Sequence, residues 1–420
     1  MKNRKIPLIA RIQPEIAEIL DYNILNVAEL FKKLSLCENM EQFCDLFMQL
    51  FSLFDNHEII YIDEFLDYNI DQILINVAFK DAILELKSIA LEWIELLTAS
   101  SHHEYISALV EKKLLEQCSK CFESSDKYEL PTMIRISINI FYFCTEKKDK
   151  FLKKYGFSFF EPLTSNPRGC ENLITRLLYS IVQNGDTYYE DDFLFVLDRV
   201  LHFHSLSCIT SVHWAIACSC NSKSFAEKLI NLEGFGQSLT ISFNTGNPDS
   251  FHPSLLILRQ IYSFTDIDIP GFDIKILEKL ILIEENPYLS ELLMVFENLL
   301  TNPRKTSIFI HTSLIDYVAN MYFQLDYESK KLIVSIIHNI IHTASSDELL
   351  ILLEKGILGT LAYSLEIDDR EIYQKSIASS LSLLELNRLH ALHFHSQFMS
   401  VFCEESRIEE LSLFEKYTNG

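Results

Sequence analysis

The segment "IVSIIHNIIHTA" (Ile333–Ala344) decides how this chain folds, because "LLMVFENLLTN" (Leu292–Asn302) superposes on it with Asn298 over Asn339. Both segments place apolar residues at the i, i+3, i+4 and i+7 positions of an amphipathic helix. The two asparagines are 41 residues apart. A helix that recurs at such a spacing indicates a repeat protein, in which each unit buries its apolar face against its neighbours.

The same spacing continues in both directions along the chain. An apolar helix is expected around each of nine anchor residues, which are Ser52, Leu97, Asn139, Ser180, Cys218, Gln260, Asn298, Asn339 and Leu383. Successive anchors lie 38 to 45 residues apart. A mean period of about 41 residues is typical of helical solenoids, which stack similar units along one direction.

A turn also recurs inside the units. Glycine follows three of the anchors by 16 or 17 residues, as Gly156 in "KKYGF", Gly234 in "LEGF" and Gly356 in "EKGIL". Two related junctions without glycine read "VEKKLL" (Val110–Leu115) and "LEKLIL" (Leu277–Leu282). At each junction we expect one helix to end in a left-handed residue before the next begins. Longer loops are expected at "QNGDTYYEDD" (residues 183–192) and "SFNTGNPDSFHPS" (residues 242–254).

These features together resemble armadillo-repeat proteins, whose units contain two short helices, a turn and a long third helix. The best-matching unit is "SSDELLILLEKGILGTLAYSLEIDDREIYQKSIASSLSLLELN" (Ser345–Asn387). The resemblance covers roughly residues 28–400 as eight or nine units. It implies an all-α fold, a right-handed α-solenoid of armadillo/HEAT type. We expect one continuous domain over residues 1–420, with a capping helix at each end.

Composition supports a folded helical chain and narrows the range of partners. The chain has 48% hydrophobic residues but only 10 glycines and 10 prolines in 420 residues, which disfavours folds that need many tight turns. The net charge of −23 disfavours nucleic acids and anionic membranes as direct partners. Ten scattered cysteines and the lack of a long apolar run or signal peptide favour the cytoplasm, with the nucleus as the alternative.

The resemblance also points to candidate binding residues. In armadillo proteins of the importin-α kind, the third helix carries a tryptophan four residues before an asparagine, and both face a peptide groove. Here no unit carries both residues, and arginine takes the tryptophan position in two neighbouring units. The groove candidates are Trp93, Arg135, Asn139, Arg176, Trp214, Asn298 and Asn339. The tryptophans could instead be core aromatics, and the arginines could lie on a solvated face or together select an acidic or phosphorylated peptide.

No pattern in the sequence predicts catalysis, a cofactor or a metal site. Cys118-x-x-Cys121 lacks the second ligand pair of a structural zinc site, and "HFHS" (His202–Ser205 and His393–Ser396) has no nearby ligands. His213 and Cys218 would point to different sides of a helix, which disfavours a Cys-His nucleophile. Gly234-x-Gly236 lacks the rest of a phosphate-binding loop.

The expected function is therefore non-enzymatic binding of a protein or an extended peptide in the concave groove of the solenoid. Asparagine side chains would hydrogen-bond the backbone of the ligand, and neighbouring positions would select its side chains. Two alternatives remain open. One is an importin-α-like nuclear transport adaptor for basic cargo, which the acidic charge would attract. The other is a structural scaffold that uses its outer face or its ends.

Overall fold

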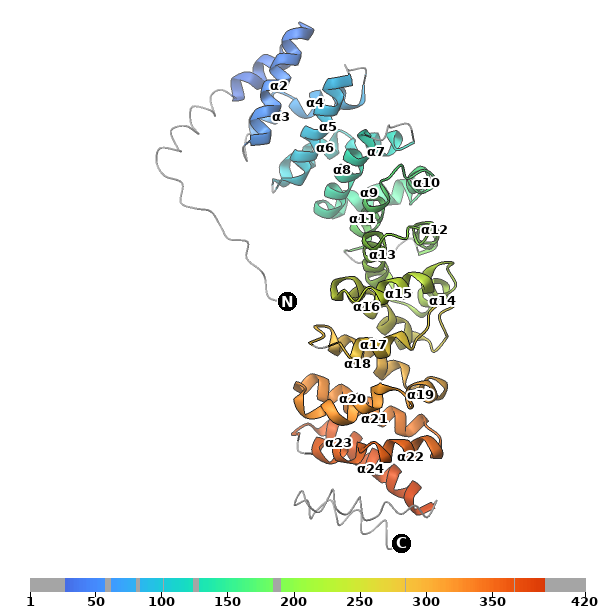
Figure 1. Cartoon of the computed structure of the whole chain (residues 1–420). Helices are drawn as coiled ribbons and strands as arrows, with labels where there is room; N and C mark the ends of the chain where they lie inside the picture. The colour runs from blue at the N-terminus through green and yellow to red at the C-terminus, as the bar shows by residue number, and fades with distance from the viewer. Residues whose placement is uncertain are drawn as a thin grey trace, which may run out of the picture. The chain divides into compact units, whose positions relative to one another are not determined.

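The computed structural model describes residues 27–56, 62–80, 84–100, 102–123, 128–183, 190–283, 285–365 and 367–389. All regular secondary structure in these ranges is helical, which confirms the predicted all-α class (Figure 1). No helix among them is both long and apolar enough to cross a membrane. Residues 1–26 and 390–420 lie outside the described residues. They include the second "HFHS" and the chain ends where the capping helices are expected, and most of the expected loop at 183–192 is also outside the described residues.

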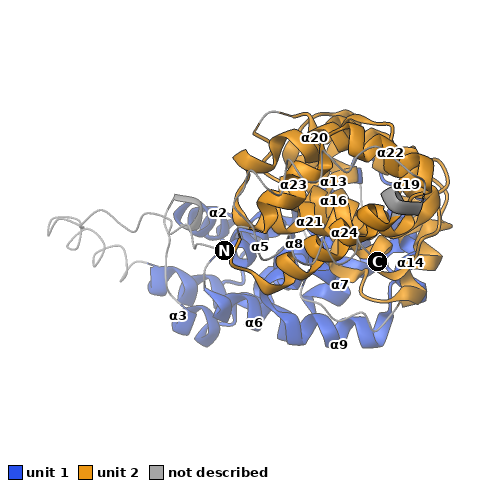
Figure 2. Ribbon diagram, turned by 90° about the horizontal axis from the view of Figure 1, so that it is seen from below, with its two compact units in different colours: residues 1–184, 191–196 blue, residues 185–190, 197–420 orange. Residues whose placement is uncertain are grey.

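The chain divides into two compact units, drawn in different colours in Figure 2. Unit 1 consists of residues 1–184 and 191–196, and unit 2 of residues 185–190 and 197–420. Helix α12 (Glu190–Val200) contributes residues to both.

Unit 1 stacks helices that are neighbours in the sequence. It contains α2 (Met40–Asn56), α3 (Ile62–Asp67), α4 (Ile70–Phe79), α5 (Leu84–Ala99), α6 (His103–Glu111), α7 (Leu114–Cys121), α8 (Glu129–Phe143), α9 (Thr145–Tyr155), α10 (Phe160–Ser165) and α11 (Glu171–Val182). The long helices α2, α5, α8 and α11 pack each against the next. We call these the third helices of unit 1.

Unit 2 follows the same plan. It contains α13 (Leu206–Ser219), α14 (Lys223–Ile230), α15 (Phe235–Asn244), α16 (Pro248–Phe264), α17 (Ile276–Ile281), α18 (Leu289–Leu299), α19 (Pro303–Phe309), α20 (Ser313–Met321), the short 3₁₀ helix η1 (Tyr322–Gln324), α21 (Tyr327–Thr343), α22 (Ser346–Glu354), α23 (Ile357–Ser364) and α24 (Arg370–Leu389). Its third helices, α13, α16, α18, α21 and α24, pack consecutively, and α15, α17, α20 and α23 form a second consecutive row. Each of the nine anchor residues lies on a third helix, so the helices expected at these positions are confirmed.

Side-chain caps fix where many of these helices begin. An oxygen of the N-cap side chain accepts a hydrogen bond from a backbone N–H of the first turn at Ser205, Ser222, Asn247, Asn302, Thr312 and Asp326. Ser345 and Glu348 form a reciprocal capping box at α22. These bonds satisfy N–H groups that have no partner inside the helix, so they define the repeat boundaries locally.

The left-handed turns agree with the sequence at most junctions. Gly234, Gly356 and, in "VEKKLL", Lys113 adopt left-handed conformations directly before α15, α23 and α7. Gly156 has a positive φ of 58° but a ψ of −142°, so it is not left-handed helical. The expectation for "LEKLIL" was wrong, because these residues form α17 and the positive φ falls later, on Glu285.

The prediction of a long loop at residues 242–254 was also wrong. Helix α15 runs to Asn244 and α16 already begins at Pro248. The Asn247 side chain caps α16, and Pro248 occupies its first turn, where the missing N–H costs nothing. Turn-forming residues here mark a helix start, so only three residues connect the two helices.

One repeat of unit 2 lacks a helix. Helices α14, α19 and α22 each come directly after a third helix and before a helix of the second row. After α16, this position is taken by residues 265–275, which form no helix and contain the turn at Pro270 and Gly271. The segment lies against α15 so closely that a Cβ on Gly236 would be 2.0 Å from the Pro270 carbonyl oxygen. The missing helix leaves space beside the C-terminal ends of α16 and α18, where a pocket is found.

Candidate binding site

Three amide side chains connect the third helices of unit 2. The side-chain amide nitrogen of Gln260 donates to the Ala217 carbonyl (3.1 Å). Asn298 donates in the same way to the Arg259 carbonyl (3.2 Å), and Asn339 to the Glu297 carbonyl (2.8 Å). We call Gln260, Asn298 and Asn339 the amide ladder. Each bond runs from one third helix to the preceding one, so the ladder holds neighbouring repeats together.

Part of the amide ladder is still available for bonding. Each amide has two N–H donors and one acceptor oxygen, and the ladder uses one donor of each. Asn298 and Asn339 are half-buried, and the second N–H and the oxygen of each have no partner among the described residues. The Gln260 oxygen is buried without a partner in the same part of the chain. Asn298 and Asn339 can therefore bond a ligand without giving up the bond between helices.

Two candidates of unit 1, Asn139 and Arg135, have partners on a neighbouring helix, and Arg176 has none within the described ranges. Asn139 on α8 donates to the Thr98 hydroxyl on α5 (3.2 Å). Arg135 Nε lies 2.6 Å from a carboxylate oxygen of Glu95, so an acidic ligand would have to compete with that carboxylate. Arg176 is exposed on α11 and has no hydrogen bond or ion pair within the described ranges.

The two tryptophans occupy different environments. Trp93 has no exposed surface and packs against Phe47 and Phe51, with ring centroids 5.2 and 6.4 Å away. It is thus a core aromatic, which corrects the groove assignment, because a side chain without exposed surface cannot contact a ligand in this conformation. Trp214 is half-buried on α13 and can contact one.

Trp214 begins a row of aromatic rings that runs from α13 to α16 and on to Tyr288, the N-cap residue of α18. Its ring lies edge-on to His252, with centroids 5.3 Å apart, and His252 stacks on Tyr288 at 3.8 Å. We call Trp214, His252 and Tyr288 the aromatic row. Burial lowers the pKa of His252, while the nearby carboxylates of Glu291 and Asp249 act in the opposite direction.

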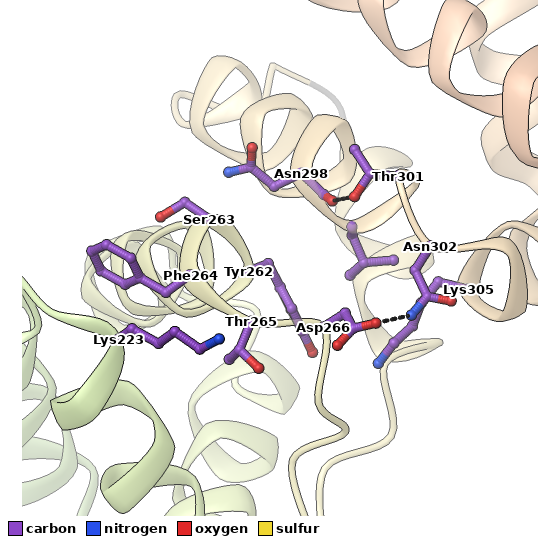
Figure 3. Close-up of a pocket in the computed structure, with 11 residues that line it drawn as sticks. Lys223, Tyr262, Ser263, Phe264, Thr265, Asp266, Asn298, Thr301, Asn302 and Lys305 are labelled. Carbon is purple, nitrogen blue, oxygen red and sulfur yellow. Dashed lines mark hydrogen bonds between the residues drawn. The ribbon is translucent and has the colours of Figure 1, made fainter.

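A pocket of about 320 Å³ adjoins the amide ladder at Asn298, in the space left by the missing helix (Figure 3). Its polar lining includes Lys223, Tyr262, Asp266, Asn298, Asn302 and Lys305. Asn302 donates to the Asp266 carboxylate (2.9 Å), and Thr301 donates to the Asn298 carbonyl (2.7 Å). Figure 3 shows the ends of the Tyr262 and Lys305 side chains on the same side of the pocket, next to Asp266.

Lys305 and Tyr262 are the most deeply placed polar groups of the pocket. The Lys305 side chain is 5% exposed, and its ammonium pairs with the carboxylate of Asp268, which is 88% exposed. The same ammonium lies over the Tyr262 ring, 5.3 Å from its centroid. Burial raises the pKa of Tyr262, and the Asp268 charge adds to this, so the phenol keeps its proton at neutral pH.

Sequence reasoning missed this pocket. The usable signal was the stretch "TDIDIPGFDIK" (residues 265–275), which has no helical spacing and a Pro-Gly turn where a short first helix is due. A repeat that loses one helix exposes residues that the helix would cover, and here these are the C-terminal ends of two third helices.

Three of the cysteines and histidines from the sequence patterns that the structure describes are buried. Cys118 is fully buried on α7, and burial raises the pKa of its thiol. Burial raises the pKa of Cys220 to about 12. His213 is fully buried and contacts two serine hydroxyls, at Ser254 (2.7 Å) and Ser238 (2.8 Å). Within the described part of the chain, no group of three or more histidine, cysteine or carboxylate side chains is placed to hold a metal ion.

Comparison with known proteins adds information on the fold alone. No protein-family model matches the chain, and no curated protein matches it. Among solved structures, it is similar to the crystal structure of an engineered protein from the Northeast Structural Genomics Consortium. The TM-score is 0.67 at 15% sequence identity, over 92% of this chain and 98% of the other. The arrangement of helices is thus one that occurs in a crystallised protein of different sequence.

Proposed function

We propose that this chain is a right-handed solenoid of armadillo type, with a period of about 41 residues, that binds an extended peptide along its third helices. The observation that carries the proposal is the pair of half-used amides at Asn298 and Asn339. No catalytic group is needed for this function, since the binding energy comes from repeated polar contacts.

The chemistry of an amide side chain fits an extended backbone. An extended peptide presents N–H and C=O groups that are not used within the peptide itself, and an amide can donate to one and accept from the other. Packed helices lie about 8–10 Å apart, and an extended chain rises about 3.3 Å per residue. Successive ladder positions would thus meet the ligand backbone every two or three residues, whatever its side chains.

The proposal can be tested with a displayed library of random dodecapeptides. We expect selection to yield peptides that bind the wild-type chain, and the double variant Asn298→Ala, Asn339→Ala to bind them about 10- to 100-fold more weakly. This range corresponds to two or more lost hydrogen bonds at about 1 kcal/mol each. Binding is measured by fluorescence anisotropy with labelled peptides.

The matched control is the double variant Asn231→Ala, Asn320→Ala. Both of these asparagines are exposed, and each donates only to a carbonyl four residues earlier in its own segment. This control variant removes two asparagine amides that lie outside the third helices, and it should bind the peptides as the wild type does. Equal affinity of both double variants, with thermal unfolding unchanged, would exclude the ladder as the peptide site.

The importin-α-like alternative has one observation in its favour. The aromatic row on α13, on α16 and at the N-cap of α18 has the carboxylates of Asp249 and Glu291 nearby. Aromatic faces beside carboxylates suit lysine or arginine side chains. The same peptide library distinguishes this alternative from the proposed binding of extended peptides through the amide ladder. Enrichment of lysine and arginine, lost in Trp214→Ala, supports an adaptor for basic cargo, and enrichment without basic residues argues against it.

A further inference from the structure

We propose that the pocket beside Asn298 binds an oxyanion, a phosphoryl or carboxylate group, on the Lys305 ammonium and the Tyr262 hydroxyl, in place of the carboxylate of Asp268. The inference does not depend on peptide binding along the third helices, because it rests on the groups inside the pocket.

The first argument is the position of Lys305. Burying an ammonium is costly unless a negative charge accompanies it. Here the buried ammonium has an ion-pair partner that is itself almost fully exposed, Asp268 on the segment that replaces a helix. An ammonium has three N–H donors, and this pair is the single hydrogen bond of Lys305 among the described residues. The pocket therefore holds a cation with donors to spare.

The second argument is the Tyr262 hydroxyl. Tyr262 is 8% exposed and lines the pocket, yet its hydroxyl has no hydrogen-bond partner within the described ranges. Because Tyr262 lines the pocket, an acceptor that enters it gains a hydrogen bond that Asp268 does not make. Figure 3 places this hydroxyl and the Lys305 ammonium on the same side. A group with two or more oxygens can accept from both.

The third argument is that the carboxylate of Asp268 can leave the Lys305 ammonium. Asp266 and Asp268 are exposed and lie in residues 265–275, which form no helix, so the Asp268 side chain can turn away without unfolding a helix. Asp268 makes no other bond among the described residues, and Asp266 is held by Asn302. Once Asp268 turns to solvent, the incoming oxyanion keeps the Lys305 charge compensated. Lys223 at the pocket edge adds a second, exposed ammonium.

Isothermal titration calorimetry with inorganic phosphate, and separately with N-acetyl-O-phosphoserine amide, tests the proposal at low and constant ionic strength. We expect both probes to bind the wild-type chain. Tyr262→Phe, which removes one hydroxyl and no packing, should weaken binding about fivefold. Lys305→Met should weaken it at least tenfold, and Asp268→Asn should strengthen it, because the competing carboxylate is gone.

Charge-matched controls distinguish binding in the pocket from an effect of the protein's overall charge on anion affinity. Lys279→Met and Asp273→Asn change exposed residues that do not line the pocket, by the same charges as Lys305→Met and Asp268→Asn. They should leave both affinities within twofold of the wild type. Tighter binding of the phosphoserine probe would assign the site to a peptide-borne group, and equal binding to a small free anion. No binding of either probe, or equal losses in Lys305→Met and Lys279→Met with none in Tyr262→Phe, would overturn the proposal.

Discussion

At the scale of single residues, unit 2 contains a buried polar chain centred on His213. The Ser238 hydroxyl donates to the Phe235 carbonyl (2.7 Å), so its oxygen accepts from His213 Nε2. Nδ1 lies 2.7 Å from the Ser254 hydroxyl, which also contacts the Ser242 hydroxyl (2.8 Å). Both ring nitrogens therefore have a hydroxyl partner, and burial lowers the pKa of His213 to about 3, so the ring is neutral at pH 7.

This depressed pKa predicts a loss of stability in mild acid. Between pH about 6.5 and 3, the unfolded chain binds a proton that the folded chain excludes, so the contribution of His213 is full above pH about 6.5 and falls as the pH drops. We expect about 2 kcal/mol less stability from this group at pH 5 than at pH 7. His213→Gln should remove that part of the pH dependence in urea unfolding measured at both pH values.

Burial also lowers the pKa of His252 and His338, so the comparison uses the difference between wild type and variant, not the slope alone. His204→Gln replaces an exposed histidine and should keep the wild-type slope. If His213→Gln kept that slope as well, His213 would not be the buried neutral group described here.

The residue scale is also where sequence reasoning is least reliable for the binding site. The repeat spacing located Asn298 and Asn339 on third helices, but spacing alone does not show how much surface a side chain exposes, and Trp93 is in the core. Lys305 and Tyr262 could not be recognised as a pair. The segment without a helix (residues 265–275) follows Tyr262 closely in the sequence but precedes Lys305 by 30 to 40 residues, and only the fold brings the two side chains together.

At the scale of elements, left-handed turns set the angle between the first two helices of several repeats. Lys113 adopts this conformation with a φ of 65°, although a side chain with a Cβ is strained there. Gly356 adopts it with a φ of 83° and no neighbouring atom within 4 Å of an added Cβ. The turn is therefore required by the fold, and the sequence meets the requirement with glycine at one junction and by accepting strain at the other.

Exchanging the residue types at these turns should change stability in opposite directions. We expect Lys113→Gly to stabilise the chain by about 1 kcal/mol and Gly356→Ala to destabilise it by about 1 kcal/mol, since an L-residue in this conformation costs about that much. Urea unfolding midpoints measure both. Gly359→Ala is the control, because Gly359 is inside α23 with free space around it, and alanine should stabilise that helix. A destabilising Lys113→Gly would contradict the strain argument.

At the scale of elements, some sequence signals were sufficient to predict the helices and others were not. Helical spacing found every third helix, because a long apolar face leaves a strong periodic pattern. It failed where short elements meet. The sequence pattern predicts a loop at Asn247 and Pro248, which instead begin α16, and a turn in "LEKLIL", most of which lies in α17. Pro and Gly mark the end of a pattern but do not say whether a helix or a loop follows.

At the scale of the whole molecule, helices pack on helices close to them in the sequence within each unit. Stability in such stacks is a sum of local terms between neighbours, so damage in one place should stay there. A substitution at Gly236 would introduce a local packing defect in unit 2. A Cβ at this position would meet the Pro270 carbonyl oxygen at 2.0 Å and the Phe272 nitrogen at 2.9 Å, and both atoms belong to backbone that must move.

We therefore expect Gly236→Ala to open unit 2 locally and to leave unit 1 unchanged. Overpacking against backbone costs about 1–3 kcal/mol, so amide hydrogen exchange, followed by mass spectrometry, should speed up in α15, α17 and residues 265–275. Exchange in α5 and α8 should stay at the wild-type rate. Gly246→Ala is the control within unit 2, because nothing lies within 4 Å of its added Cβ and only the strain of its positive φ is introduced. Faster exchange throughout both units in Gly236→Ala would mean that the chain opens as one cooperative body, and the description as a stack of local contacts would then be wrong.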